Sequence, residues 1–251
     1  MKKVFLFAIT ALLLTACQKQ STEQTASGEG RIAITASASG EVITRADGIQ
    51  VATPQLSDFS LLITGENFEK SWNSLSDYRT DDERYTAGNY TVAISCGDST
   101  QEGYNLPAFA ASETVQVLDR NRTTEVTLTA KLTNAIVAIQ TTEAFDNYFP
   151  VSEFKLTTTA NSFDIDPEQT EHLYVAAGQD IKIDCSCIRQ SNMSTGTVET
   201  LATQTVANTA AATRYVVTYD LSTVGGVTIT VKLNQTIIDT IVVDTELNPN
   251  A

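Results

Sequence analysis

The sequence is short of the residues on which catalysis and metal binding most often depend. His172 is the only histidine, so a serine triad would have no other choice of base. A zinc site at Cys185 and Cys187 would lack a second pair of ligands. No Gly-rich phosphate loop is present, and the thirty acidic residues form no recognisable catalytic motif. We therefore expect a protein that is not an enzyme and holds no cofactor and no metal.

Long apolar runs and helical patterns are equally scarce. Beyond residue 16, no segment has the length and apolarity of a transmembrane helix. Beyond residue 16, no long segment repeats its apolar residues with the helical period of 3.6 residues. We therefore expect helix to be limited to about one turn near Ser74–Tyr78.

Positive charge is the third deficiency. The chain carries 16 basic and 30 acidic residues, a formal charge of −14. Without residues 1–16, which include Lys2 and Lys3, the formal charge changes from −14 to −16. This balance disfavours nucleic acid and anionic lipid headgroups as partners.

The N-terminus has the pattern of an export signal. Lys2 and Lys3 precede an apolar run, Val4 to Leu14, that is too short to span a bilayer as a helix. The following Leu14-Thr15-Ala16-Cys17 resembles a bacterial lipobox. We expect residues 1–16 to be a lipoprotein signal peptide, with Cys17 the lipidation site. The alternative is an ordinary secretory signal with a chance cysteine.

Lipids on Cys17 would anchor the protein to the outer membrane, with the chain at the cell surface. Each buried CH₂ of an acyl chain such as palmitate contributes about 0.8 kcal/mol, so two or three chains hold a protein on a membrane. Residues 17–29 are polar and read as a flexible tether.

The mature chain is dominated by segments in which apolar residues alternate with polar ones, rich in Val, Ile, Thr, Tyr and Phe. A strand with one apolar face must bury it against a second sheet, so the pattern predicts an all-β fold of stacked sheets. The expected strands are Arg31–Ala36, Asp58–Thr64, Asn89–Cys96, Glu113–Leu118, Thr124–Leu132, Ala135–Thr141, Val151–Thr157, Asp180–Ile188, Arg214–Tyr219, Val227–Leu233 and Thr236–Val243.

Three short matches in the same order indicate a duplicated domain. Asp58–Leu61 matches Glu153–Leu156, Ala87-Gly88 matches Ala177-Gly178, and Val126–Leu132 matches Val227–Leu233. We therefore expect an N-terminal β-sandwich over residues 30–133 and a C-terminal β-sandwich over residues 134–251.

The cysteines other than Cys17 fall on apolar strand faces. Cys96 shares a face with Val92 and Ile94, and Cys185 and Cys187 share one with their own strand's isoleucines. We expect buried thiols that act as small hydrophobes. A disulfide is the alternative in an oxidising compartment, although three cysteines leave one thiol over.

The ordered set of motifs from Gly30 to Val137 resembles a family of Bacteroidales fimbrillin-like lipoproteins, which are cell-surface adhesion or fimbrial subunits. The matching motifs are Val42–Ala46, Asp58–Ile63, Lys70–Trp72, Ala87–Val92 with Cys96–Asp98, Pro107–Phe109 and Val126–Val137. The second half matches in architecture alone.

The resemblance implies two transthyretin- or immunoglobulin-like β-sandwich domains in tandem, and it implies assembly by donor-strand exchange. Fimbrillins are cut after an arginine near the end of the first strand, and a strand of a neighbouring pilus-type subunit or another copy fills the opened groove. Arg45-Ala46 lies where that proteolytic processing would fall, and Thr236–Val243 is a β-prone segment that could be donated. The alternatives are an exposed loop arginine and an ordinary last strand.

A second function remains open beside assembly. The chain could be a stand-alone surface lipoprotein that binds glycans or host proteins through its loops. Loops over residues 80–86, 97–107 and 190–197 would carry such contacts.

Overall fold

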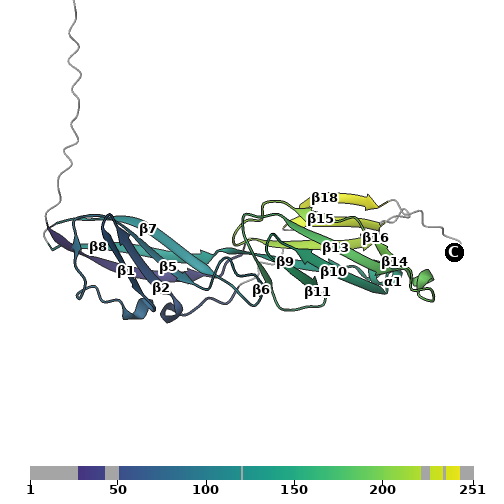
Figure 1. Ribbon diagram of the computed structural model, residues 1–251, viewed down its shortest axis with the longest axis horizontal. Coiled ribbons are helices and arrows are strands. Elements are labelled where there is room, and N and C mark those ends of the chain that lie inside the picture. The colour runs from purple at the N-terminus through teal and green to yellow at the C-terminus, as the bar shows by residue number, and fades with distance from the viewer. Residues whose placement is uncertain (1–27, 43–50, 120, 222–226, 234–235, 244–251) are drawn as a thin grey trace, which may run out of the picture.

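Strands make up most of the part of the chain that the structure describes, as Figure 1 shows. The computed structural model describes residues 28–42, 51–119, 121–221, 227–233 and 236–243, with the backbone alone for the last two ranges. Two β-rich halves lie end to end along the long axis. The prediction of an all-β fold built from stacked sheets is confirmed. No helix within the described ranges is long and apolar enough to cross a bilayer.

The first half is one curled sheet of seven strands in the order β3-β2-β5-β7-β8-β1-β4. β7 and β8 pair only where Phe109 and Ala110 face Leu132 and Lys131, so the sheet opens beyond that point into two layers. The strands are β1 (Glu29–Ser39), β2 (Ser60–Gly65), β3 (Phe68–Trp72), β4 (Tyr85–Thr86), β5 (Gly88–Cys96), β7 (Phe109–Val117) and β8 (Thr123–Leu132).

The core of the first half lies between these layers. From Glu125 onward β8 alternates between exposed and buried residues, as expected for a strand with one face exposed to solvent. Its buried Val126 and Leu128 meet Leu61 of β2 and Ile94 of β5 in one cluster. Two short 3-10 turns, η1 (Leu56–Asp58) and η2 (Leu75–Asp77), flank the sheet. The second lies within the turn predicted near Ser74–Tyr78, and Ser74 caps it.

The second half has two sheets. Five strands lie in the order β11-β10-β13-β14, with β15 also on β13, and six lie in the order β18-β17-β16-β9-β12-β6. The strands are β6 (Gly103–Tyr104), β9 (Asn134–Thr141), β10 (Val151–Thr157), β11 (Ser162–Ile165), β12 (Leu173–Ala176), β13 (Ile181–Ile188), β14 (Val198–Thr200), β15 (Gln204–Val206), β16 (Arg214–Leu221), β17 (Val227–Leu233) and β18 (Thr236–Val243). A 3-10 turn, η3 (Gln190–Asn192), precedes β14.

The expectation that helix is confined to one turn near Ser74–Tyr78 is wrong. The helix α1 (Glu143–Tyr148) follows β9, and its first turn is capped by Thr142, whose hydroxyl accepts a hydrogen bond from the Phe145 amide at 3.3 Å. Phe145 is fully buried in the second core. A helix of six residues is too short to show a period in the sequence, and its cap and one buried ring hold it in place.

The same order of pairings recurs in both halves. β1 pairs in parallel with β8, and β9 pairs in parallel with β16. Each first strand also has an antiparallel neighbour, β4 or β12, and each half has an antiparallel trio, β3-β2-β5 or β11-β10-β13. The counterpart of β8 is therefore β16, not β17 as the third sequence match implied, because β-strands resemble one another in composition. The boundary between residues 133 and 134 stays a prediction; it falls between β8 and β9.

The three cysteines of the described chain are free thiols on apolar faces, as predicted. Cys185 and Cys187 are buried in the second core, and Cys96 packs half-buried against the first. Burial raises the pKa of Cys96, so its thiol stays protonated at neutral pH.

The two cores are not fully separate. β6 is a short strand from the loop between β5 and β7 of the first half, yet it pairs with β12 in the six-stranded sheet of the second. Ile136 of β9 and Tyr174 of β12 face each other across that sheet and belong to the first core. Their strand neighbours Val137 and Leu173 belong to the second core.

Replacing Phe154 by alanine should destabilise the second half strongly. Its ring is 2% exposed and packs against the rings of Phe145 and Tyr219, with centroids 6.4 and 4.8 Å away. We expect Phe154→Ala to lower the free energy of unfolding by about 3–5 kcal/mol, measured by denaturant unfolding. The adjacent Glu153 is exposed on the same strand. Glu153→Ala should change stability by no more than about 0.5 kcal/mol, and an equal loss in both variants would contradict this account of the core.

Candidate functional site

The first strand has an unusual position in its sheet. β1 pairs with β8 over nine consecutive residues, from Arg31 to Ser39, which face Thr123 to Lys131. Its other edge pairs with β4 only through Glu29 and Gly30. Most of β1 is therefore an edge strand, which contacts the rest of its sheet through β8.

The inner face of β1 belongs to the first core. Ile32 is fully buried, and Ile34, Ala36 and Ala38 pack partly buried against the same cluster. On the outward face Thr35, Ser37 and Ser39 are small and polar, and Ser37 shares a hydrogen bond of 3.2 Å with Thr129 of β8. Removing β1 would uncover both the edge amides of β8 and an apolar strip of the core.

A pair of tyrosines holds the otherwise unpaired edge of β1, and no sequence pattern indicated it. The Tyr78 hydroxyl donates to the Ile32 carbonyl at 2.6 Å, and the Tyr85 hydroxyl donates to that of Tyr78 at 3.3 Å. Burial raises the pKa of both phenols, so both stay protonated donors. Trp72 packs edge-on against Tyr78 with centroids 5.1 Å apart.

The predicted processing residues follow β1 in the chain. Arg45 and Ala46 lie outside the described residues, as does the lipidation residue Cys17. The flanks of the 43–50 segment are fixed, because Val42 and Val51 are both buried in the first core and the Val51 amide donates to the Gly40 carbonyl at 3.0 Å. A side chain at Gly40 would meet the Val51 carbonyl oxygen at 1.9 Å, so this close approach requires glycine.

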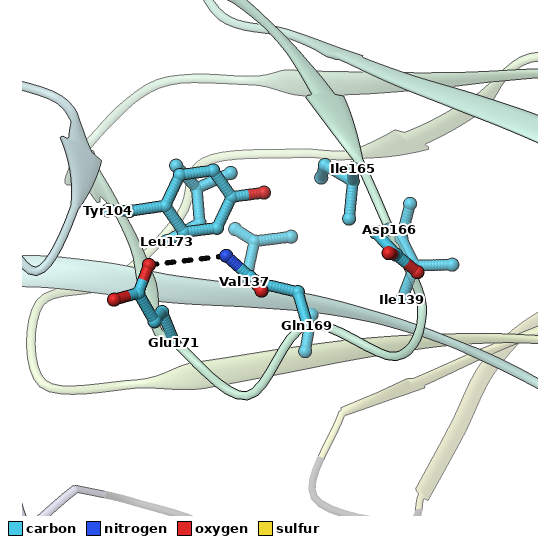
Figure 2. A pocket seen from close by; sticks show the side chains of 9 residues that line it. Tyr104, Val137, Ile139, Ile165, Asp166, Gln169, Glu171 and Leu173 are labelled. Carbon is cyan, nitrogen blue, oxygen red and sulfur yellow. Dashed lines mark hydrogen bonds between the residues drawn. The ribbon is translucent and has the colours of Figure 1, made fainter.

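A small hollow lies at the junction of the two halves, as Figure 2 shows. Val137, Ile165 and Leu173 form apolar walls, and Tyr104 lies beside Glu171 at the rim. Its empty space is about 240 Å³ even when open solvent is counted. Pockets that enclose small molecules are typically about 300–1,000 Å³. The hollow therefore gives little support to an enclosed ligand site.

In the described part of the chain, the histidine and the acidic residues do not come together in a catalytic or metal-binding arrangement. His172 is half-buried rather than a freely exposed surface residue, and burial together with the charge of Arg214 lowers its pKa. Asp81 lies 3.7 Å from Arg31, and Glu83 pairs with Lys70. Within the described ranges, no three His, Cys, Asp or Glu side chains come together in a way that could hold a metal ion.

Removing the Tyr78 hydroxyl should loosen β1 specifically. Tyr78→Phe keeps the ring against Trp72 but leaves the Ile32 carbonyl without its donor, and we expect a loss of about 0.5–1.5 kcal/mol in the free energy of unfolding. Hydrogen exchange should quicken in β1 more than in β5. Tyr148→Phe is the matched control on the second half. Equal exchange in β1 of the two variants would show that the hydroxyl does not hold the strand.

Comparison with known proteins gives one match to a family model. A model described as a domain of unknown function, DUF4493, matches residues 28–249. No curated protein matches the sequence significantly.

Several solved structures of bacterial proteins are distantly similar. A fimbrial assembly protein from Parabacteroides distasonis is 7% identical, with a TM-score of 0.44 over 86% of this chain and 98% of that chain. A protein from Bacteroides ovatus thought to act in cell adhesion is 15% identical, with a TM-score of 0.39 over 84% of this chain and 100% of that one. A protein from Bacteroides thetaiotaomicron thought to bind polysaccharides is 7% identical, with a TM-score of 0.43 over 81% and 96%. Likenesses this distant do not decide what the chain does.

Proposed function

We propose that this chain, which belongs to the family described as a domain of unknown function, DUF4493, is a lipid-anchored structural or adhesive subunit of the fimbrillin-like kind. The observation that carries the proposal is the position of β1, an edge strand that lies in parallel on β8 and precedes Arg45 in the chain. A fold alone does not imply function. The proposal therefore rests on this strand and on the motifs of the N-terminus.

The lipid anchor places the subunit at the surface of the outer membrane. Cys17 follows a charged and apolar leader in a lipobox-like motif, and the polar residues 18–28 separate it from β1. Acyl chains on Cys17 would hold the protein to the membrane while the tether leaves the folded part free in solution.

Assembly would proceed by exchange of β1. While the chain is intact, its continuity between Val42 and Val51 keeps β1 attached to its own core, at a high effective concentration. A cut after Arg45 removes that connection, so β1 can leave. A strand from a neighbouring copy or another pilus-type subunit would then pair with β8 and fill the apolar strip that Ile32 occupied.

The C-terminal segment is the donor that the sequence offers. β18 lies at the edge of the six-stranded sheet, where it pairs antiparallel with β17 of the same chain. In the monomer it is thus the last strand of its own half, and donation requires it to leave β17. An edge position makes that exchange possible without breaking the interior of the sheet.

Cys17 should be the sole site of lipid attachment. In cells fed labelled palmitate, we expect the wild-type protein to incorporate label and to partition into detergent. Cys17→Ser should abolish both, because the thioether to diacylglycerol cannot form. Cys96→Ser is the control and should keep the label. Retention of label by Cys17→Ser would refute the anchor.

Cleavage at Arg45 should precede assembly. Limited trypsin digestion of the folded protein should cut first after Arg45, detected by mass spectrometry, and the cut protein should form multimers that persist in denaturant and increase with protein concentration. Arg45→Ala should stay intact at this position and stay monomeric. If trypsin cuts elsewhere first and leaves Arg45 intact, the processing step is refuted.

Truncation tests the donor separately from the cut. Deleting residues 236–251 should prevent multimers after cleavage at Arg45 while leaving the release of β1 unaffected. Multimers of equal yield from the truncated protein would show that another strand is donated.

A stand-alone binding role is the second candidate. Val151, Ile188 and Val198 face one another across β10, β13 and β14, and Val198 is 59% exposed. Met193 in the neighbouring loop is 48% exposed. Exposed apolar groups at one end of a molecule favour contact with a protein partner. This role would leave a cut at Arg45 without effect on the oligomeric state.

A further inference from the structure

The carboxylate of Glu102 joins the two halves of the molecule. Glu102 lies in the loop between β5 and β7 of the first half, directly before β6. Its Oε2 accepts hydrogen bonds from the Thr158 hydroxyl at 2.6 Å and the Asn161 side-chain amide at 2.9 Å. Its Oε1 accepts from the Ala176 backbone amide at 3.0 Å and from the Gln179 side-chain amide.

All four donors belong to the second half. Thr158 and Asn161 form the turn between β10 and β11, Ala176 ends β12, and Gln179 lies in the turn before β13. These turns are themselves fixed, since the Thr159 amide donates to the Gln179 side-chain carbonyl at 2.9 Å. The donors therefore form a preset cradle for one carboxylate.

The hydrogen bonds around Glu102 are of the stronger kind, because the acceptor is charged. Burial acts to raise the pKa of Glu102, but the bonds from Thr158, Asn161, Ala176 and Gln179 outweigh it, and the pKa is lowered. The carboxylate is thus ionised and half-buried, and its charge is balanced by neutral donors. Each donor has a fixed direction. The four donors therefore set both the position of the loop and the strength with which it binds the second half.

Further contacts at the same junction act together with Glu102. Tyr104 and Gly103 pair with Leu173 and Tyr174 as β6 on β12. The Asn105 side-chain amide donates to Glu171 at 2.7 Å. Where the loop rejoins β7, the Ala108 amide donates to the side-chain oxygen of Asn134, which is fully buried.

We propose that Glu102 couples the two halves, so that they unfold as one cooperative unit and keep a fixed relative orientation. A loop of the first half enters the sheet of the second, and Glu102 is its only side chain with four described bonds across the junction. This role is independent of the proposed assembly, since it concerns the single chain. Of the loop over residues 97–107, which was expected to contact a ligand, residues 102–105 are thus occupied at the junction.

The single tryptophan allows a direct test on the full chain. Trp72 lies in β3, so its fluorescence reports the first half alone, whereas far-UV circular dichroism reports strands of both halves. In the wild type the two thermal transitions should coincide. In Glu102→Ala they should separate by about 4–8 °C, which is the shift that about 1 kcal/mol produces in a domain of roughly 100 residues.

Two further variants supply a control and a milder perturbation. Glu125→Gln removes an exposed carboxylate from β8, and its two transitions should coincide as in the wild type. Gln179→Ala removes one of the four donors and should give a smaller separation, which provides a graded result should Glu102→Ala fold poorly. Small-angle scattering should show a wider spread of end-to-end lengths for Glu102→Ala than for Glu125→Gln.

Coincident transitions in both Glu102→Ala and Gln179→Ala, with unchanged scattering, would overturn the proposal. Separate transitions in the wild type would overturn it as well, because the two halves would then unfold independently although Glu102 is present.

Discussion

The parallel pair of β1 and β8 is the contact on which the first half of the molecule depends. It joins residues about ninety positions apart, such as Arg31 and Thr123, and so closes the first half from its two ends. Ile32 fills the core while the backbone of β1 covers the edge of β8. A strand held by one neighbour and a few side chains can be exchanged, whereas a central strand such as β5, which pairs with β2 and β7, cannot.

The second half repeats this arrangement with one difference. β9 lies in parallel on β16 as β1 does on β8, but β9 also pairs with β12 over four residues, and β12 with β6. Ile136 and Tyr174 are covered by the first core at the same place. The first strand of the second half is thus interior, whereas that of the first half remains at an edge. The duplication gives two similar sandwiches, and of their two first strands only β1 lies at an edge over most of its length.

Much of the fold could be predicted from the alternation of apolar and polar residues. The segments around Val151–Thr157 and Asn89–Cys96 alternate clearly, and they are the strands β10 and β5. Short strands such as β4 and β6 were missed, because two residues show no period and their pairing depends on distant partners. The helix α1 was missed for the same reason. The Tyr78 hydroxyl and the Glu102 cradle could not be predicted, since their partners come from segments whose proximity only the folded chain reveals.

Hydrogen exchange in β8 tests the central claim most directly. In the intact chain, the amides of β8 that pair with β1 should be protected. After cleavage at Arg45 and removal of the N-terminal fragment, the account predicts that this protection is lost while that of β5 and β13 persists, and that a concentrated solution regains it as another strand pairs with β8. Unchanged protection of β8 after removal of the fragment would show that β1 does not cover this edge and would contradict the account.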